Sequence, residues 1–182
     1  MILKPQDVFV TLKLVALSGR EWTYLQLAGE LSMSASEINA AVKRATRARL
    51  LTPPAGRRDH PRPILMALEE FLVHGLKYVF PPDRGELAVG VPTSGAAPPL
   101  AGHEPCHEEL PPVWPYRRGT VRGYGFSPLF RSAPAAAAVD PCLYELLSLV
   151  DAVRDERCRS RNRAARELIS RLSPSGGASP SM

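Results

Sequence analysis

The sequence predicts a mainly α fold, and three observations support that class. Residues 5–49 repeat apolar side chains at helical spacing in three short stretches. The same spacing returns over residues 64–80 and again from residue 141 onward. Between them, residues 81–141 hold 12 of the chain's 19 prolines, which disfavours a regular helix or a central strand. We therefore expect an N-terminal helical domain, a Pro-rich extended strap, and a C-terminal helix or helical hairpin.

The N-terminal domain is expected to contain three helices in series. The first covers residues 5–18, with a proline in its first turn. A short second helix over residues 24–31 begins after Thr23, and a third runs from Ser34 to near Arg49, because Thr and Ser cap helix N-termini well. The buried face of the third helix is expected to consist of Ile38, Ala41, Val42 and Ala45.

A basic loop is expected after the third helix. Residues 53–63 contain four prolines and a glycine, which exclude a helix, and they also carry several arginines. A strongly apolar helix then covers residues 64–80 and ends at a pair of prolines.

The Pro-rich segment carries aromatic residues at 113–116 and 121–130, too many for an ordinary disordered spacer. We expect an extended strap that packs on the helices and includes at most a short hairpin. Asp140 and the proline after it start another helix, which reaches at least Arg154. The arginine-rich stretch that follows either prolongs this helix or begins a second one, and the tail after Ser173 is expected to be disordered.

Charge and cysteines point to a cytoplasmic protein that binds a polyanion. The formal net charge is +5 and the pI is near 9.4. Residues 1–62 hold 10 Lys/Arg against 5 Asp/Glu, whereas residues 63–182 hold 13 of each, so the excess lies in the N-terminal third. Three unevenly spaced cysteines without a signal peptide indicate a reducing compartment. No apolar run reaches 18 residues, so we expect no membrane-spanning helix.

The order of helix, short helix, tight turn, capped helix and basic loop places one helix across a DNA backbone and the next in the major groove. On residues 22–38, 41–44 and 50–51, the chain resembles winged helix-turn-helix transcription regulators of the MarR type. The resemblance covers about a third of the chain. It implies a sequence-specific regulator of double-stranded DNA, with repression the expected sign, located with the nucleoid in the cytoplasm.

The third helix is the expected reader of base edges. Asn39 suits adenine, Ser36 suits a base or a phosphate, and Ala35 or Ala40 suits a thymine methyl group. Phosphate contacts are expected from Lys43, Arg44 and Arg47 and, on the second helix, from Thr23 and Gln26. Ser34 at the start of the third helix completes this set. A solvated polar face without a ligand is the alternative.

The wing of such regulators corresponds to the basic loop, with Arg57, Arg58, His60 and Arg62 as its contact residues. Four prolines leave little room for two regular wing strands, so we expect a reduced hairpin. An exposed basic loop without a partner is the alternative.

These expectations divide the chain into five regions. The regions are a winged helix-turn-helix domain (1–62), a packing helix (63–80), a Pro/Ala/Gly-rich strap (81–140), a helical dimerisation or partner-binding region (141–172) and a tail (173–182).

The apolar stripe of the helix after Asp140 is expected to cover a second copy, since such regulators act as two-fold dimers. Its members are Leu143, Leu146, Leu147, Val150 and Val153. Packing within the same chain is one alternative. Another is an antitoxin or defence-system adaptor, whose C-terminal half binds a partner protein while the N-terminal domain regulates its own operon.

Residues 103–109 combine imidazole, thiol and carboxylate groups, but their spacing matches no metal-binding template. We predict neither a metal nor another cofactor. The sequence also lacks a phosphate-binding glycine loop, a nucleophile elbow and a convincing catalytic pair, so we expect a protein that is not an enzyme.

Overall fold

The computed structural model describes residues 2–54, 56, 59–102 and 110–173. The chain divides into two compact units, each built from two separate stretches of sequence. Unit 1 comprises Met1–Leu68 and Pro128–Tyr144, and unit 2 comprises Glu69–Ser127 and Glu145–Met182. This division crosses the linear boundaries expected from the sequence.

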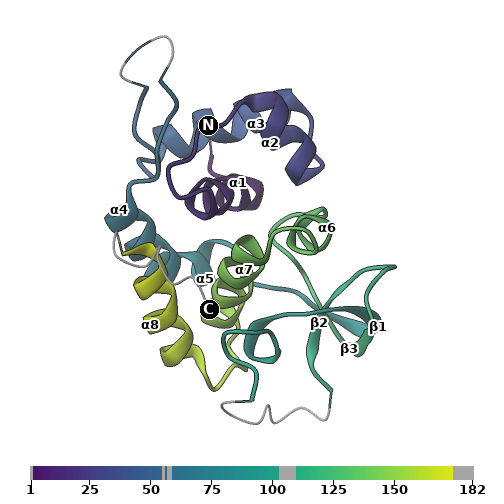
Figure 1. The fold of residues 1–182 in the computed structure, drawn as a ribbon. Helices are drawn as coiled ribbons and strands as arrows, with labels where there is room; N and C mark the ends of the chain where they lie inside the picture. The colour runs from purple at the N-terminus through teal and green to yellow at the C-terminus, as the bar shows by residue number, and fades with distance from the viewer. Residues whose placement is uncertain (1, 55, 57–58, 103–109, 174–182) are drawn as a thin grey trace, which may run out of the picture. The chain divides into compact units, whose positions relative to one another are not determined.

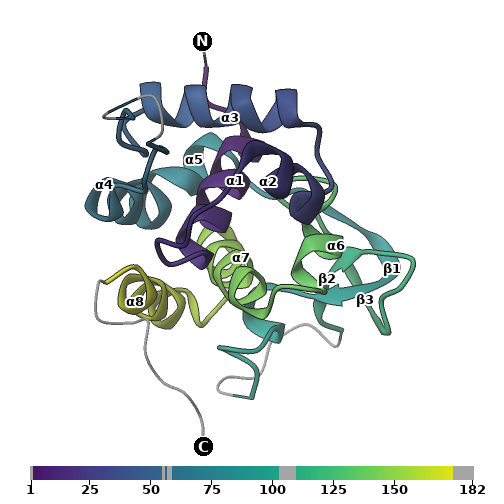
Figure 2. The same cartoon turned by 45° about the horizontal axis from the view of Figure 1, so that its top comes forward.

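Unit 1 is organised around α1 (Pro5–Ala16), α2 (Tyr24–Leu31) and α3 (Ala35–Arg47), three helices that confirm the predicted series (Figure 1). Figure 2 shows α3 lying across α1 and α2. The predicted buried stripe of α3 is confirmed, because Ile38, Ala41, Val42 and Ala45 are at most 2% exposed. The core beneath it is filled by Val8, Phe9, Leu12, Leu27 and Leu31.

A short alanine-rich helix from much later in the sequence, α6 (Ala133–Ala137), completes unit 1. The Ser132 hydroxyl donates a hydrogen bond of 2.6 Å to the carbonyl of Leu31 at the end of α2. The rings of Phe130 and Phe9 stack with centroids 6.0 Å apart. Part of the predicted strap is therefore a packed element of the N-terminal unit.

The basic loop belongs to unit 1. Its two ends run antiparallel to each other and are joined by an isolated β-bridge between Leu51 and Pro63. The Thr52 amide donates to the Arg62 carbonyl at 2.8 Å, and the Arg62 amide donates to Thr52 Oγ1 at 3.0 Å. The expected reduction of the wing hairpin is confirmed in the described ends of the loop.

The predicted apolar helix of residues 64–80 is confirmed as α4 (Leu65–Glu70), a π-helical turn (Phe71–Gly75) and α5 (Leu76–Val79). Leu68, Leu72 and Leu76 point into the core and are fully buried. From Glu69 onward this helix belongs to unit 2.

Unit 2 contains a small mixed sheet of β1 (Arg84–Pro92), β2 (Pro112–Pro115) and β3 (Val121–Phe126). β1 pairs antiparallel with both other strands, while β2 and β3 pair in parallel, so the three strands close on themselves. A 3-10 turn over Ser94–Ala96 follows β1.

Two glycines allow this closure. A Cβ atom on Gly90 would lie 1.9 Å from the Trp114 carbonyl oxygen, and one on Gly123 would lie 2.0 Å from the Pro111 carbonyl oxygen. Both distances are far below van der Waals contact, so only glycine fits where the backbones of neighbouring strands meet.

The helix predicted to begin at residue 141 is confirmed as α7 (Pro141–Arg154), and a separate α8 (Arg161–Leu172) follows it. The stripe expected to cover a second copy is already buried within the chain. Leu143, Leu146, Leu147, Val150 and Val153 are each at most 4% exposed. Intramolecular packing, the alternative considered above, therefore accounts for this face.

The predicted fold class is wrong. The chain is not mainly α with an extended strap, because the segment expected to be a strap contains the three-stranded sheet and α6. The class is α plus β. Within the described residues, no helix has the length and apolar character needed to cross a membrane.

Candidate nucleic-acid interface

The turn between α2 and α3 is fixed by local backbone chemistry. Ser32 ends α2 in the left-handed conformation, with φ of 51°, and Ser34 begins α3. The Glu37 amide donates to Ser34 Oγ at 3.1 Å, while the Ser34 amide donates to the Glu37 carboxylate at 2.8 Å. The hydrogen bonds that the Ser34 amide and hydroxyl donate to the Glu37 carboxylate lower the pKa of Glu37. The reciprocal cap sets where α3 starts and so which of its side chains face solvent.

A buried ion pair fixes α3 against α1. Nε and Nη2 of Arg44 donate to the two carboxylate oxygens of Asp7 at 2.8 and 2.6 Å. The Asp7 side chain is fully buried and that of Arg44 is 10% exposed. Hydrogen bonding to Asp7 raises the pKa of Arg44 further above its usual value. Arg44 was predicted to contact phosphate, but its guanidinium is held in the interior.

A second ion-pair cluster joins α1, α2 and the residue before α7, all within unit 1. Lys13 Nζ lies 2.6 Å from Glu30 and 2.6 Å from Asp140. Burial alone would lower the pKa of Lys13, but its bonds to Asp140 and Glu30 outweigh burial and raise it. Burial likewise opposes ionisation of Asp140, yet the bonds from Lys13 and the Leu143 amide hold its pKa below the usual value. The cluster stabilises the platform on which α3 rests.

The solvent-facing side of α3 carries the predicted base-reading residues. We call it the α3 outer face, and it consists of Ala35, Ser36, Asn39, Ala40, Lys43 and Arg47. Ser36, Lys43 and Arg47 are exposed, while Asn39 and Ala40 are half-buried. Spacings of three and four residues bring these side chains onto one side of the helix. The face offers an amide, a hydroxyl and two cations to a ligand.

The predicted residues at the two helix N-termini are engaged locally. Thr23 caps α2 and accepts from the Gln26 amide at 3.1 Å, and the Gln26 side chain donates to Glu30 at 2.8 Å. The Ser34 hydroxyl donates to Glu37 at 2.8 Å. Thr23, Gln26 and Ser34 are exposed, so a phosphate could still approach them beside α3.

The two predicted wing residues that the structure describes, His60 and Arg62, differ in their exposure and contacts. The rings of His60 and Trp22 contact each other at a tilt of 33°, with centroids 4.3 Å apart, and this contact holds the end of the loop against Trp22. Arg62 is exposed at the base of the loop. A hollow of about 110 Å³ lies between them, lined in part by Arg20. Arg57 and Arg58 lie outside the described residues.

One cation near the candidate interface was missed in the sequence. Arg131 is exposed in unit 1, its guanidinium lies 5.6 Å from the Phe130 ring centre, and its charge acts on Glu37 at the start of α3. Nothing local in the sequence marks it, because it lies in the segment read as a strap. Arg131 acts on Glu37 because residues 128–137 pack against the end of α2, where the Ser132 hydroxyl binds the Leu31 carbonyl.

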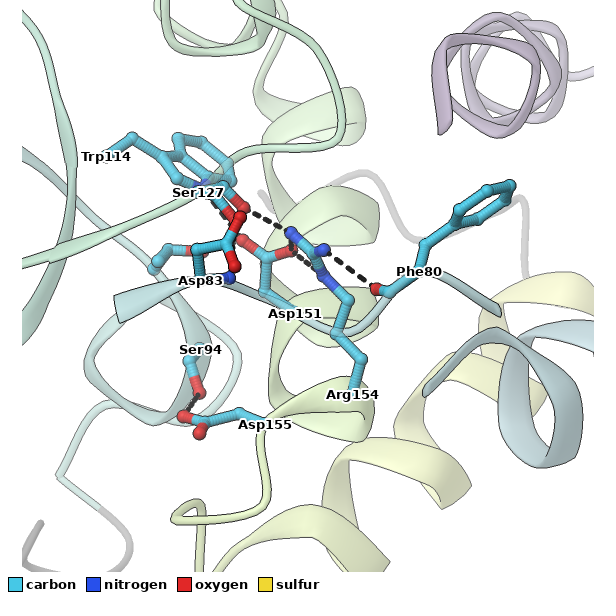
Figure 3. A network of polar contacts seen from close by, with 9 residues as sticks. Phe80, Asp83, Ser94, Trp114, Ser127, Asp151, Arg154 and Asp155 are labelled. Atoms are coloured by element: carbon cyan, nitrogen blue, oxygen red, sulfur yellow. Dashed lines mark hydrogen bonds and ion pairs between the residues drawn. The ribbon is translucent and has the colours of Figure 1, made fainter. Parts of the chain in front are cut away.

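Unit 2 holds a buried polar network around Asp151 and Arg154 (Figure 3). Asp151 accepts from Thr93 Oγ1 at 2.7 Å, from Trp114 Nε1 at 2.6 Å and from Arg154 Nε at 2.9 Å. Arg154 also donates to the carbonyls of Phe80 and Ser127. The network joins α7 to Trp114 on β2 and to Thr93, the residue after β1.

The candidate metal cluster at 103–109 lies outside the described residues. Among the residues that the structure describes, no group of three or more His, Cys, Asp or Glu side chains is placed to hold a metal ion.

A capped helix that crosses two others and turns a polar, cationic face to solvent is the arrangement that helix-turn-helix proteins present to DNA. Comparison of the chain with protein-family models, curated proteins and solved structures gives no significant match. The resemblance to MarR-type regulators thus stays a prediction from residues 22–51.

Proposed function

We propose that the chain binds double-stranded DNA through the α3 outer face and acts as a sequence-specific transcription regulator. The proposal rests on one observation, the contrast between the buried side and the solvent-facing side of α3. One side is buried and clamped to Asp7 by Arg44, while the other presents Ser36, Asn39, Lys43 and Arg47. A rigid helix with an exposed amide and flanking cations suits base readout between phosphate contacts.

The charge of the surface supports a nucleic acid as ligand. Lys43 and Arg47 on α3 and Arg131 beside its N-terminus are exposed, and Arg62 extends the positive charge onto the wing. Arg44 takes no part, since it neutralises Asp7. Repression is the sign that the resemblance implies. The adaptor whose C-terminal half binds a partner protein stays a second hypothesis; burial of the α7 stripe removes one surface for that partner.

The test is selection of bound sequences from a random duplex pool, followed by anisotropy titration of the selected duplex. Lys43→Gln/Arg47→Gln should weaken binding to every duplex and reduce the salt slope by about 1.8 for two lost phosphate contacts. Asn39→Ala should instead relax the preference at one base position. Arg117→Gln/Arg118→Gln, in the exposed turn after β2, removes the same charge elsewhere and serves as the control. Unselective, salt-insensitive binding would refute the proposal.

A further inference from the structure

The first two arginines of α8, Arg161 and Arg163, differ from three other arginines of unit 2. Among the described residues, Nε and Nη2 of Arg161 and Nε of Arg163 are buried without a hydrogen-bond partner. In contrast, Arg84 is paired with Asp155, Arg154 with Asp151, and Arg171 with Glu145 and Glu167. A buried, charged donor without an acceptor destabilises the fold, so these atoms call for an anion.

The geometry at Arg161 specifies the anion's shape. Nε and Nη2 are the two donors on one edge of the guanidinium, and Arg44 uses the same pair to hold both oxygens of Asp7. That edge matches two oxygens of a carboxylate or a phosphate. Arg161 stands three residues before the buried Ala164, at the head of the inward stripe of α8, and the residue as a whole is half-buried, so part of its side chain reaches solvent.

The surroundings favour a polyanion. Residues 157–166 include five arginines and no Asp or Glu, and Arg159 and Arg166 are exposed. Acidic side chains of α7 and α8, including Asp151 and Glu167, are engaged by other arginines. We propose that Arg161, with Arg163 as the second unpaired arginine in the first turn of α8, binds a backbone phosphate of a nucleic acid. The choice of nucleic acid over an acidic peptide rests on the function proposed for unit 1.

The first experiment tests the fork without DNA. Thermal unfolding is followed in inorganic phosphate and in chloride of equal ionic strength. Phosphate at tenfold its dissociation constant should raise the Tm by about 3–5 °C. Arg161→Gln should abolish this rise, and Arg161→Lys, which keeps the charge but loses the fork, should remove most of it. Arg117→Gln is the control and should retain the rise. Because Arg161→Gln removes an unpaired buried charge, its Tm in chloride should not fall.

The second experiment tests the identity of the polyanion. Salt-dependent binding to a duplex is compared for the full chain, Arg161→Gln/Arg163→Gln, and the control Arg117→Gln/Arg118→Gln. The slope should fall by about 0.9 for each lost phosphate contact in the α8 variant and stay unchanged in the control. A Tm rise with an unchanged slope would limit the site to free phosphate, and tighter binding of polyglutamate than of DNA would assign it to an acidic peptide. Either result overturns the proposal, as does the absence of both effects.

The two proposals fail separately. If Lys43→Gln/Arg47→Gln leaves duplex binding intact while the α8 variant weakens it, the role of the α3 outer face is refuted and the role of Arg161 stands. The opposite pattern refutes the role of Arg161 alone.

Discussion

Lys43 and Arg44 are neighbours on α3 with the same charge, and we predict opposite consequences for their loss. Replacing Arg44 by Gln leaves the carboxylate of Asp7 fully buried with only the Lys4 amide, 2.8 Å away, as a remaining polar partner. Removing one member of a buried pair costs about 3–5 kcal/mol. Lys43 is exposed, so Lys43→Gln should change the free energy of unfolding by less than about 0.5 kcal/mol. Its effect should fall on DNA binding instead.

Urea unfolding followed by circular dichroism, together with anisotropy titration of a duplex, separates the two effects. The double variant Asp7→Leu/Arg44→Met should lose less stability than Arg44→Gln, because apolar replacement of both partners leaves no uncompensated charge. The reasoning is refuted if Arg44→Gln unfolds like the parent protein while binding DNA more weakly, since that result would return Arg44 to the phosphate-contacting set.

Three further predictions concern both units. Gly90→Ala should destabilise the protein by about 3 kcal/mol in urea unfolding, because its Cβ would lie 1.9 Å from a carbonyl oxygen of β2, and a loss below about 1 kcal/mol would contradict the strand closure. Burial raises the pKa of the Cys158 thiol, whereas Cys142 is exposed. Iodoacetamide should therefore modify Cys142 before Cys158, as peptide mass spectrometry would show. Equal rates at these two cysteines would contradict the burial of Cys158. The pKa of Asp140 is lowered, so the stability it contributes is present above its usual value of 3.8 and is lost as the pH falls through its folded value. Asp140→Asn should flatten that part of the urea-midpoint profile, and an unchanged profile would remove Asp140 from the acid response.

The helices of unit 1 were predictable because their signals are local. A cap at Thr23 or Ser34 and a stripe of apolar residues every three or four positions act within one or two turns. The α3 outer face follows from the same periodicity, since burial of Ile38 and its companions leaves the opposite residues in solvent. These local signals therefore predict which side of α3 faces solvent.

The sheet was missed because its strands violate the usual strand pattern. Prolines stand at both ends of β2, where they remove few ladder hydrogen bonds, and glycines replace the inward apolar residues of β3. Gly90 and Gly123 make sense only once the backbone of a neighbouring strand is in contact with them. Proline content thus predicted a strap where long-range pairing forms a closed sheet.

The candidate site residues show that the sequence does not reveal which charged side chains are paired in the fold. Counting cations in the N-terminal third treats Lys43, Arg44 and Arg47 alike, but a guanidinium bound to a carboxylate 37 residues away is unavailable to phosphate. Conversely, residues 63–182 are neutral in sum, yet Arg84, Arg154 and Arg171 pair with acids while, among the described residues, Nε and Nη2 of Arg161 have no partner. Whether an arginine serves the fold or a ligand is therefore decided by its partner in three dimensions, and the local charge count gives only the number of candidates.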